Sequence, residues 1–159
     1  MAESLRVPED EVLAAVERLG HNVKQLEKEL QASKRRSAQQ QVEELSGRVR
    51  RVKDVGVLSA QVEHIDRETL RALVDTLRQK LGSGVIVLGT ADDAKVALIA
   101  AVTKDLTPRL HAGKIAKEVA GRVGGTGGGR PDLAEAGGKD TGRLPQALED
   151  VYGIVEKML

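Results

Sequence analysis

The chain has 159 residues, and its 25 Lys and Arg nearly balance its 24 Asp and Glu, which leaves a net charge of +1 at pH 7. That length holds one compact domain, or a smaller domain with an extended helix. Cysteine is absent, so disulfides and thiol catalysis are excluded. Tyr152 is the only aromatic residue, so the core must consist of Val, Leu, Ile and Ala, which fits helices layered on a sheet better than an aromatic stacking platform.

The N-terminal part of the chain is predicted to be a helical arm. Residues 1–8 are interpreted as a linker or chain start, and residues 9–47 as the arm. Apolar residues recur there with alternating steps of four and three, which is typical of a narrow seam that buries itself against another helix. We expect this seam to pair with another helix or to dimerise. It begins after Val12 and consists of Val16, Leu19, Val23, Leu26 and Leu30.

This seam does not continue to the end of the arm. Polar residues occupy its register between Ser33 and Gln41, and the apolar pattern returns out of phase at Val42 and Leu45. A bend, or a second short helix that folds back, explains such a change of phase. Pairing of the seam within the chain and pairing between two chains are both compatible with the sequence.

Residues 48–159 are predicted to form a small α/β domain, so the fold class is α+β with a mixed sheet packed by helices. A β-hairpin is expected at 49–62, followed by a helix that Asp66 caps and Gly82 ends. Two apolar runs without alternation, 85–88 and 96–102, are expected to be central strands covered on both faces. Two further helices are predicted at 114–123 and 144–158.

A glycine-rich loop is predicted at residues 124–138. Glycine gives up the most backbone freedom on folding, so this composition must serve positive-φ turns or a close approach of backbone N–H groups to an anionic surface. Arg130 at the end of the run can grip a phosphate with two parallel hydrogen bonds. The alternative is that the glycines only pack against the sheet while Arg130 pairs with Asp132 or Glu135.

The predicted site is therefore an anion-binding surface for nucleic acid and not an active site. Walker and dinucleotide signatures are absent, and His21, His64 and His111 lack the spacing of metal ligands, so no catalytic or metal-binding residue is predicted. No apolar run is long enough for a membrane and no signal peptide is visible, so we expect a cytoplasmic protein. The candidate nucleic-acid-binding residues are Lys104, Arg109, His111, Gly113, Lys114, Gly125, Gly127, Gly128, Gly129 and Arg130.

Three segments together resemble a known family. Val102-Thr103-Lys104-Asp105, His111-Ala112-Gly113 and the run from Gly124 to Gly138 look like the C-terminal, DHHA1-type domain of bacterial alanyl-tRNA synthetases. A related glycine motif in DHH-type phosphoesterases ends in His where Arg130 stands here, which favours the synthetase branch and leaves a phosphate-binding appendage as an alternative. A dimerisation module without RNA contact is the other alternative.

The resemblance implies a noncatalytic part of a larger enzyme. Such a domain binds the outer elbow of alanine-specific tRNA and bridges the aminoacylation and editing domains, which would be its partners in the same enzyme. Its helical part often supports a homodimer. ATP and zinc are implied only for those other domains, so no cofactor is expected in this chain.

Overall fold

The computed structural model describes residues 9–159, and the predicted linker at 1–8 lies outside them. The chain divides into two compact units at Gln40, and the second unit contains residues 41–159. Within the described residues, no helix combines the length and the apolar character needed to cross a bilayer.

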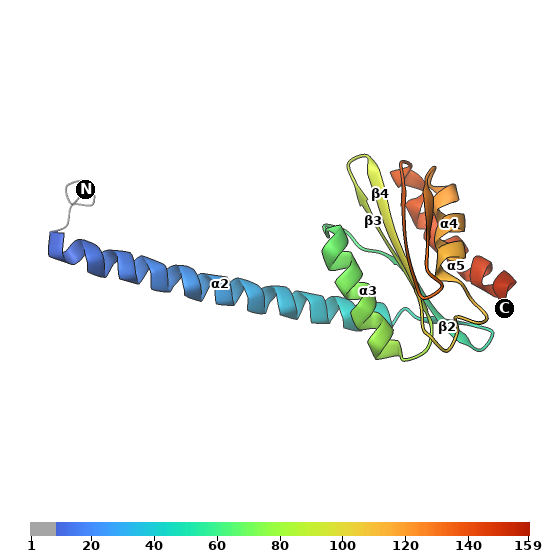
Figure 1. Cartoon of the computed structure of the whole chain (residues 1–159), viewed down its shortest axis with the longest axis horizontal. Helices are drawn as coiled ribbons and strands as arrows, with labels where there is room; N and C mark the ends of the chain where they lie inside the picture. Colours follow the sequence, from blue (N-terminus) through green and yellow to red (C-terminus); the bar gives the residue numbers. More distant parts are fainter. Residues whose placement is uncertain (1–8) are drawn as a thin grey trace. The chain divides into compact units, whose positions relative to one another are not determined.

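The arm is one long helix, α2 (Glu9–Ser46), drawn in blue to cyan in Figure 1. The predicted second helix that folds back is therefore wrong. The change of phase has another cause, because Val42 and Leu45 are buried in the second unit with Leu58 and Leu70. The seam residues Val16, Leu19, Val23, Leu26 and Leu30 are instead between 53% and 63% exposed.

The second unit contains a six-stranded mixed sheet with the order β1-β2-β3-β4-β6-β5. Only β2 and β3 pair in parallel, and the other neighbours are antiparallel. The predicted α+β class is thus confirmed, and β3 and β4 lie in the middle as expected. The strands are β1 (Arg50–Val52), β2 (Val55–Gln61), β3 (Val85–Asp92), β4 (Lys95–Val102), β5 (Thr126–Gly129) and β6 (Leu133–Gly138).

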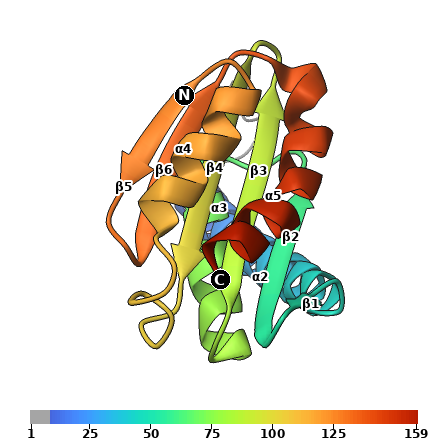
Figure 2. The ribbon, with the colours of Figure 1, turned by 90° about the vertical axis from the view of Figure 1, so that its right-hand side faces the viewer.

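Helices cover both faces of this sheet. In Figure 2, α4 (Ala112–Arg122) and α5 (Leu144–Met158) lie in front of the strands and α3 (Arg67–Leu81) lies behind them. A short 3-10 turn, η1 (Thr141–Arg143), leads into α5. Each face has its own buried cluster, as expected for central strands whose apolar runs do not alternate.

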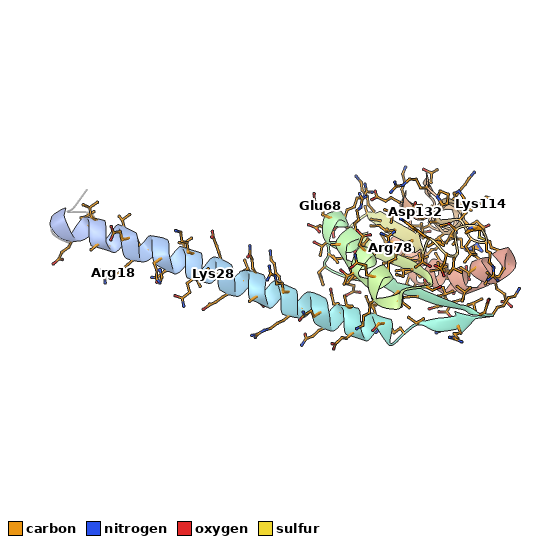
Figure 3. All side chains as sticks on the ribbon, turned by 60° about the horizontal axis from the view of Figure 1, so that its bottom comes forward. Arg18, Lys28, Glu68, Arg78, Lys114 and Asp132 are labelled. Atoms are coloured by element: carbon orange, nitrogen blue, oxygen red, sulfur yellow. The ribbon has the colours of Figure 1, made fainter. Side chains whose placement is uncertain are left out.

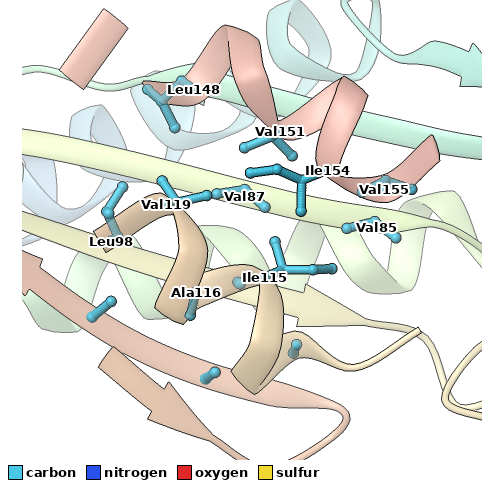
Figure 4. Close-up of a cluster of buried hydrophobic side chains, with 14 of the residues drawn as sticks. Val85, Val87, Leu98, Ile115, Ala116, Val119, Leu148, Val151, Ile154 and Val155 are labelled. Carbon is cyan, nitrogen blue, oxygen red and sulfur yellow. The ribbon is translucent and has the colours of Figure 1, made fainter. Parts of the chain in front are cut away.

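The cluster under α4 and α5 is aliphatic throughout. Figure 4 shows Val85, Val87 and Leu98 of the sheet facing the two helices. Ile115 of α4 and Val151 of α5 are fully buried against them. Each such side chain contributes about 1.5–3 kcal/mol of hydrophobic stabilisation, so aliphatic residues dominate this face, with Tyr152 partly buried against them.

Local capping fixes α3 where the sequence places it. Asp66 accepts a hydrogen bond from the Thr69 N–H at 2.8 Å, and this satisfies a donor that the helix itself leaves free. Gly82 closes the helix with a φ of 71° and donates to the Arg78 carbonyl. The β1–β2 hairpin is also confirmed, with Lys53 and Asp54 between its strands.

Candidate nucleic-acid interface

The glycine-rich segment is a strand hairpin and not the predicted loop. β5 lies at the outer edge of the sheet and pairs with β6, with Gly127 opposite Ala136 and Gly129 opposite Ala134 (Figure 2). The Arg130 N–H donates to the Leu133 carbonyl at 3.0 Å and closes the turn. Three consecutive glycines can form this edge strand because it is held by backbone hydrogen bonds to β6 and needs no side-chain contacts.

Three of the four candidate glycines between residues 125 and 129 pack against their own chain. A Cβ on Gly125 would lie 1.7 Å from the Gly137 carbonyl oxygen, and one on Gly127 would lie 2.2 Å from the Ala136 Cβ. A Cβ on Gly129 would lie 2.7 Å from the Ala134 Cα. These contacts match the packing alternative for the glycines. Gly128 differs, since a Cβ there meets nothing within 4 Å.

The start of α4 packs directly against this hairpin. Gly113 is buried, and a Cβ on it would lie 2.6 Å from the Gly129 carbonyl oxygen. The Ala112 N–H donates to the Pro131 carbonyl at 2.9 Å. His111 is the N-cap, and its Nδ1 accepts from the Lys114 N–H at 3.3 Å. The helix N-terminus therefore already uses several of its free donors within the chain.

Four predicted cations gather at one end of the sheet, where β2 and β3 begin, β4 ends and β5 turns into β6. We call this the basic end, and it comprises Lys104, Arg109, Lys114 and Arg130. All four are exposed. Lys114 and the neighbouring Asp132 are labelled in Figure 3.

Two of these cations have carboxylate partners. Arg109 contacts both carboxylate oxygens of Asp54 at 3.3 and 3.4 Å. Arg130 lies 3.6 Å from Asp132, with 71% of its side chain exposed. A surface pair of this kind is worth little and exchanges readily for a stronger anion. Lys104 and Lys114 have no ion-pair partner within residues 9–159.

Two carboxylates hold the loops of the basic end in place. The hydrogen bond from Arg109 lowers the pKa of Asp54. The Ser83 hydroxyl donates to Asp105 at 2.5 Å, and this bond, with one from Thr103, lowers the pKa of Asp105. Both carboxylates are therefore more stable as anions in the folded chain than in the unfolded chain.

Asp105→Asn is expected to flatten the acid limb of the stability curve. Because folding lowers the pKa of Asp105, its contribution is present above the ordinary value of 3.8 and is lost as the pH falls through the folded value. Urea unfolding from neutral pH to about pH 2 should show the variant less stable at neutral pH and approaching wild type in acid. Asp93→Asn, in the exposed β3–β4 turn, is the control. A constant difference across the pH range would contradict the assignment.

Sequence reasoning missed the cations around β1. Arg50 lies 2.8 Å from Glu149, and its guanidinium lies 4.7 Å from the centroid of the Tyr152 ring. The available signal was the run of four cations within residues 48–53, namely Arg48, Arg50, Arg51 and Lys53. Its pairing with Tyr152 was not readable, because the two segments are about 100 positions apart and meet only through the sheet.

Known proteins match this fold and sequence. Residues 54–157 match the DHHA1 domain family. Alanine–tRNA ligase of Pelotomaculum thermopropionicum is 49% identical over 160 residues, and that of Solibacter usitatus is 45% identical over 159. Both matches cover the whole chain but only 18% of the relative, so the chain spans under a fifth of these enzymes.

A solved structure agrees with the sequence matches. The C-Ala domain of Aquifex aeolicus alanyl-tRNA synthetase superposes with a TM-score of 0.64 at 30% identity. The match covers 68% of this chain and 97% of that domain. The glycine hairpin, the mixed sheet and the sequence identity lead to one assignment. The chain belongs to the DHHA1 domain family, as a C-terminal domain of an alanyl-tRNA synthetase.

Proposed function

We propose that this domain binds the outer elbow of alanine-specific tRNA through the basic end and has no catalytic role of its own. The observation that carries the proposal is the gathering of Lys104, Lys114 and Arg130, all exposed, beside the glycine hairpin. Phosphate contacts provide much of the affinity for nucleic acid, and a nearly neutral chain needs a local patch of this kind.

The candidate residues differ in their proposed roles. Lys104, Lys114 and Arg130 contact phosphates, and Arg109 does so after exchanging Asp54 for phosphate. Gly128 lets the RNA backbone approach β5, because the space beside its Cα is open. Gly113, Gly125, Gly127 and Gly129 act indirectly by holding the hairpin against α4, and His111 acts through its cap.

The proposal assigns aminoacylation and editing to other domains of the parent enzyme, with ATP and zinc as their cofactors. Most of the length of the related ligases lies outside the matched region. In the described part of the chain, His, Asp and Glu side chains form no group of three suited to a metal ion. Binding tRNA beside those domains would let this domain bridge the two activities in the cytoplasm.

The arm is proposed to form a homodimer. Its seam exposes large apolar side chains along a single stripe, while charged residues such as Arg18 and Lys28 project elsewhere from the helix (Figure 3). A second copy offers a seam of the same spacing, which buries both stripes by knobs-into-holes packing. This same observation favours the second candidate function, a dimerisation module without RNA contact.

Arg130→Ala is expected to weaken binding of alanine tRNA by about three- to tenfold and to lower the salt slope by about one, because one phosphate contact and its released counterion are lost. Fluorescence anisotropy across a salt series measures both quantities. An RNA duplex of equal length reports how far the domain recognises the folded tRNA.

Arg143→Ala is the matched control for this measurement. Arg143 is 74% exposed and lies 3.2 Å from Asp140, so it resembles Arg130 in exposure and pairing. It follows β6 and therefore lies at the opposite end of the sheet. Equal slopes for wild type and Arg130→Ala would remove Arg130 from the interface. Absence of tRNA binding at low salt would favour the dimerisation module.

A further inference from the structure

A polar groove lies at the sheet edge farthest from the glycine hairpin. Its volume is about 490 Å³, and its lining includes Arg48, which precedes β1, Arg50 of β1, Ser59 and Gln61 of β2, and Glu149 and Tyr152 of α5. Figure 2 shows β2 and α5 together at this edge. β1 pairs with β2 only as far as Val57, so β2 has no outer partner strand beyond that residue within residues 9–159.

The groove contains an arginine placed over an aromatic ring. The Arg50 guanidinium lies 4.7 Å from the centroid of the Tyr152 ring and is held there by Glu149 at 2.8 Å. The Tyr152 hydroxyl donates to the Ser59 carbonyl at 3.3 Å, and this bond ties the ring to β2. A guanidinium beside an aromatic ring can stack on a further planar group such as a base.

A side-chain amide and one further cation also line the groove. The Gln61 amide has no hydrogen-bond partner in the described part of the chain, so it can bind the edge of a base. Arg48 lines the groove, and both side chains of its ion pair with Glu44 are exposed to solvent. Arg51 and Lys53 extend the basic run in the sequence but do not line the groove.

We propose that this groove binds one unpaired nucleotide of an RNA strand, with its base stacked on the Arg50–Tyr152 pair and its phosphate beside Arg48. The volume fits a ligand of nucleotide size. Stacking on arginine and aromatic planes is how proteins hold splayed-out RNA bases. The inference rests on the proposed tRNA binding and adds a second contact, apart from the basic end.

The same edge suits an extended peptide less well. A peptide that adds a strand to β2 needs the outward carbonyls of that strand. Ser59 lies in the middle of the free edge, and its carbonyl already accepts from Tyr152. The Ser59 hydroxyl also donates to the Leu148 carbonyl at 2.6 Å, which ties α5 to this strand. The observations therefore favour a base over a peptide strand.

The chain offers a direct probe of this groove, since Tyr152 is the only tyrosine. Replacing tyrosine by 3-fluorotyrosine throughout the full chain gives a single fluorine NMR signal from position 152. Titration with an alanine tRNA transcript is expected to move that signal, because a base stacked nearby adds its ring current. The midpoint should match the Kd from fluorescence anisotropy.

Substitutions separate stacking from charge. Arg50→Lys keeps the charge but loses the plane, so we expect tRNA affinity to fall about fivefold with an unchanged salt slope. Tyr152→Leu is expected to weaken binding about tenfold, and Tyr152→Phe to stay within about twofold of wild type. Rescue by Phe separates loss of the ring from loss of folding.

Each outcome decides between the groove and the basic end. If tRNA binds and Arg130→Ala weakens it, while the fluorine signal and the affinity of Arg50→Lys stay unchanged, the groove inference is overturned and the proposed function stands. That result would favour an extended protein segment over a nucleotide as the ligand of the groove. If the wild-type chain binds no tRNA at low salt, the proposed function fails and the groove inference fails with it.

Discussion

Gly125→Ala is expected to destabilise the globular unit severely, by about 3 kcal/mol or more. The new Cβ would lie 1.7 Å from the Gly137 carbonyl oxygen and 2.5 Å from the Gly138 Cα. Both neighbours are backbone atoms, so neither can rotate away as a flexible side chain can, and the β5–β6 pairing must separate. Urea unfolding followed by circular dichroism measures the loss.

Gly128→Ala is the matched control, three residues further along the chain in β5. A Cβ at this position meets nothing within 4 Å, and its φ is not positive, so alanine fits without strain. We expect its free energy of unfolding to stay within about 0.5 kcal/mol of wild type. A similar loss in both variants would mean that β5 depends on backbone freedom and not on the close approach to β6.

Leu26→Asp is expected to weaken self-association of the chain by about 100-fold or more, because each dimer would bury two facing carboxylates in its seam. Leu26 lies near the middle of the seam and is 63% exposed in the single chain. The substitution should leave the unfolding of residues 41–159 unchanged, since the arm belongs to the other compact unit. Sedimentation velocity over a range of concentrations measures the association.

Gln25→Asp provides the control for charge. Gln25 is exposed on the same turn but lies off the seam, so it introduces the same charge without entering the proposed interface. Its association should equal that of wild type. A wild-type chain that remains monomeric at high concentration would contradict the dimer and leave the apolar stripe without a partner in solution.

Local chemistry made much of the fold predictable. The Asp66 cap and Gly82 mark the ends of α3 because each satisfies backbone groups that a helix leaves free. The unbroken apolar runs of β3 and β4 predicted central strands, since only a strand covered on both faces needs no polar side. These signals lie within a few residues of the feature that they determine.

The errors arose where the partner is remote in sequence. Glycine has no side chain whose pattern could show a strand, and the signal for β5 lies in the small residues of β6, Ala134 and Ala136, which face its glycines. The phase change in α2 is similar. Val42 and Leu45 are apolar because they pack in the core of the sheet domain and not in the seam. One unbroken helix therefore contains two apolar patterns that are out of phase.

The candidate site was predictable only in part. The position of Lys104, Lys114 and Arg130 at one end of the sheet follows from the order of the strands and of α4. The ion pair between Arg109 and Asp54 joins residues 55 positions apart, so no local sequence pattern predicts it. The direction of each glycine depends on the register of β5 against β6, which the composition of the segment does not contain.

The close packing of the glycine hairpin changes how evolutionary comparison of this family should be read. At Gly125, Gly127 and Gly129 natural selection can act through folding alone, because any larger residue collides with the neighbouring strand. An invariant glycine in those columns therefore carries no information about a ligand. Gly128 has room for a side chain, so folding does not require glycine there. An invariant glycine at that position would therefore indicate that a ligand docks on strand β5.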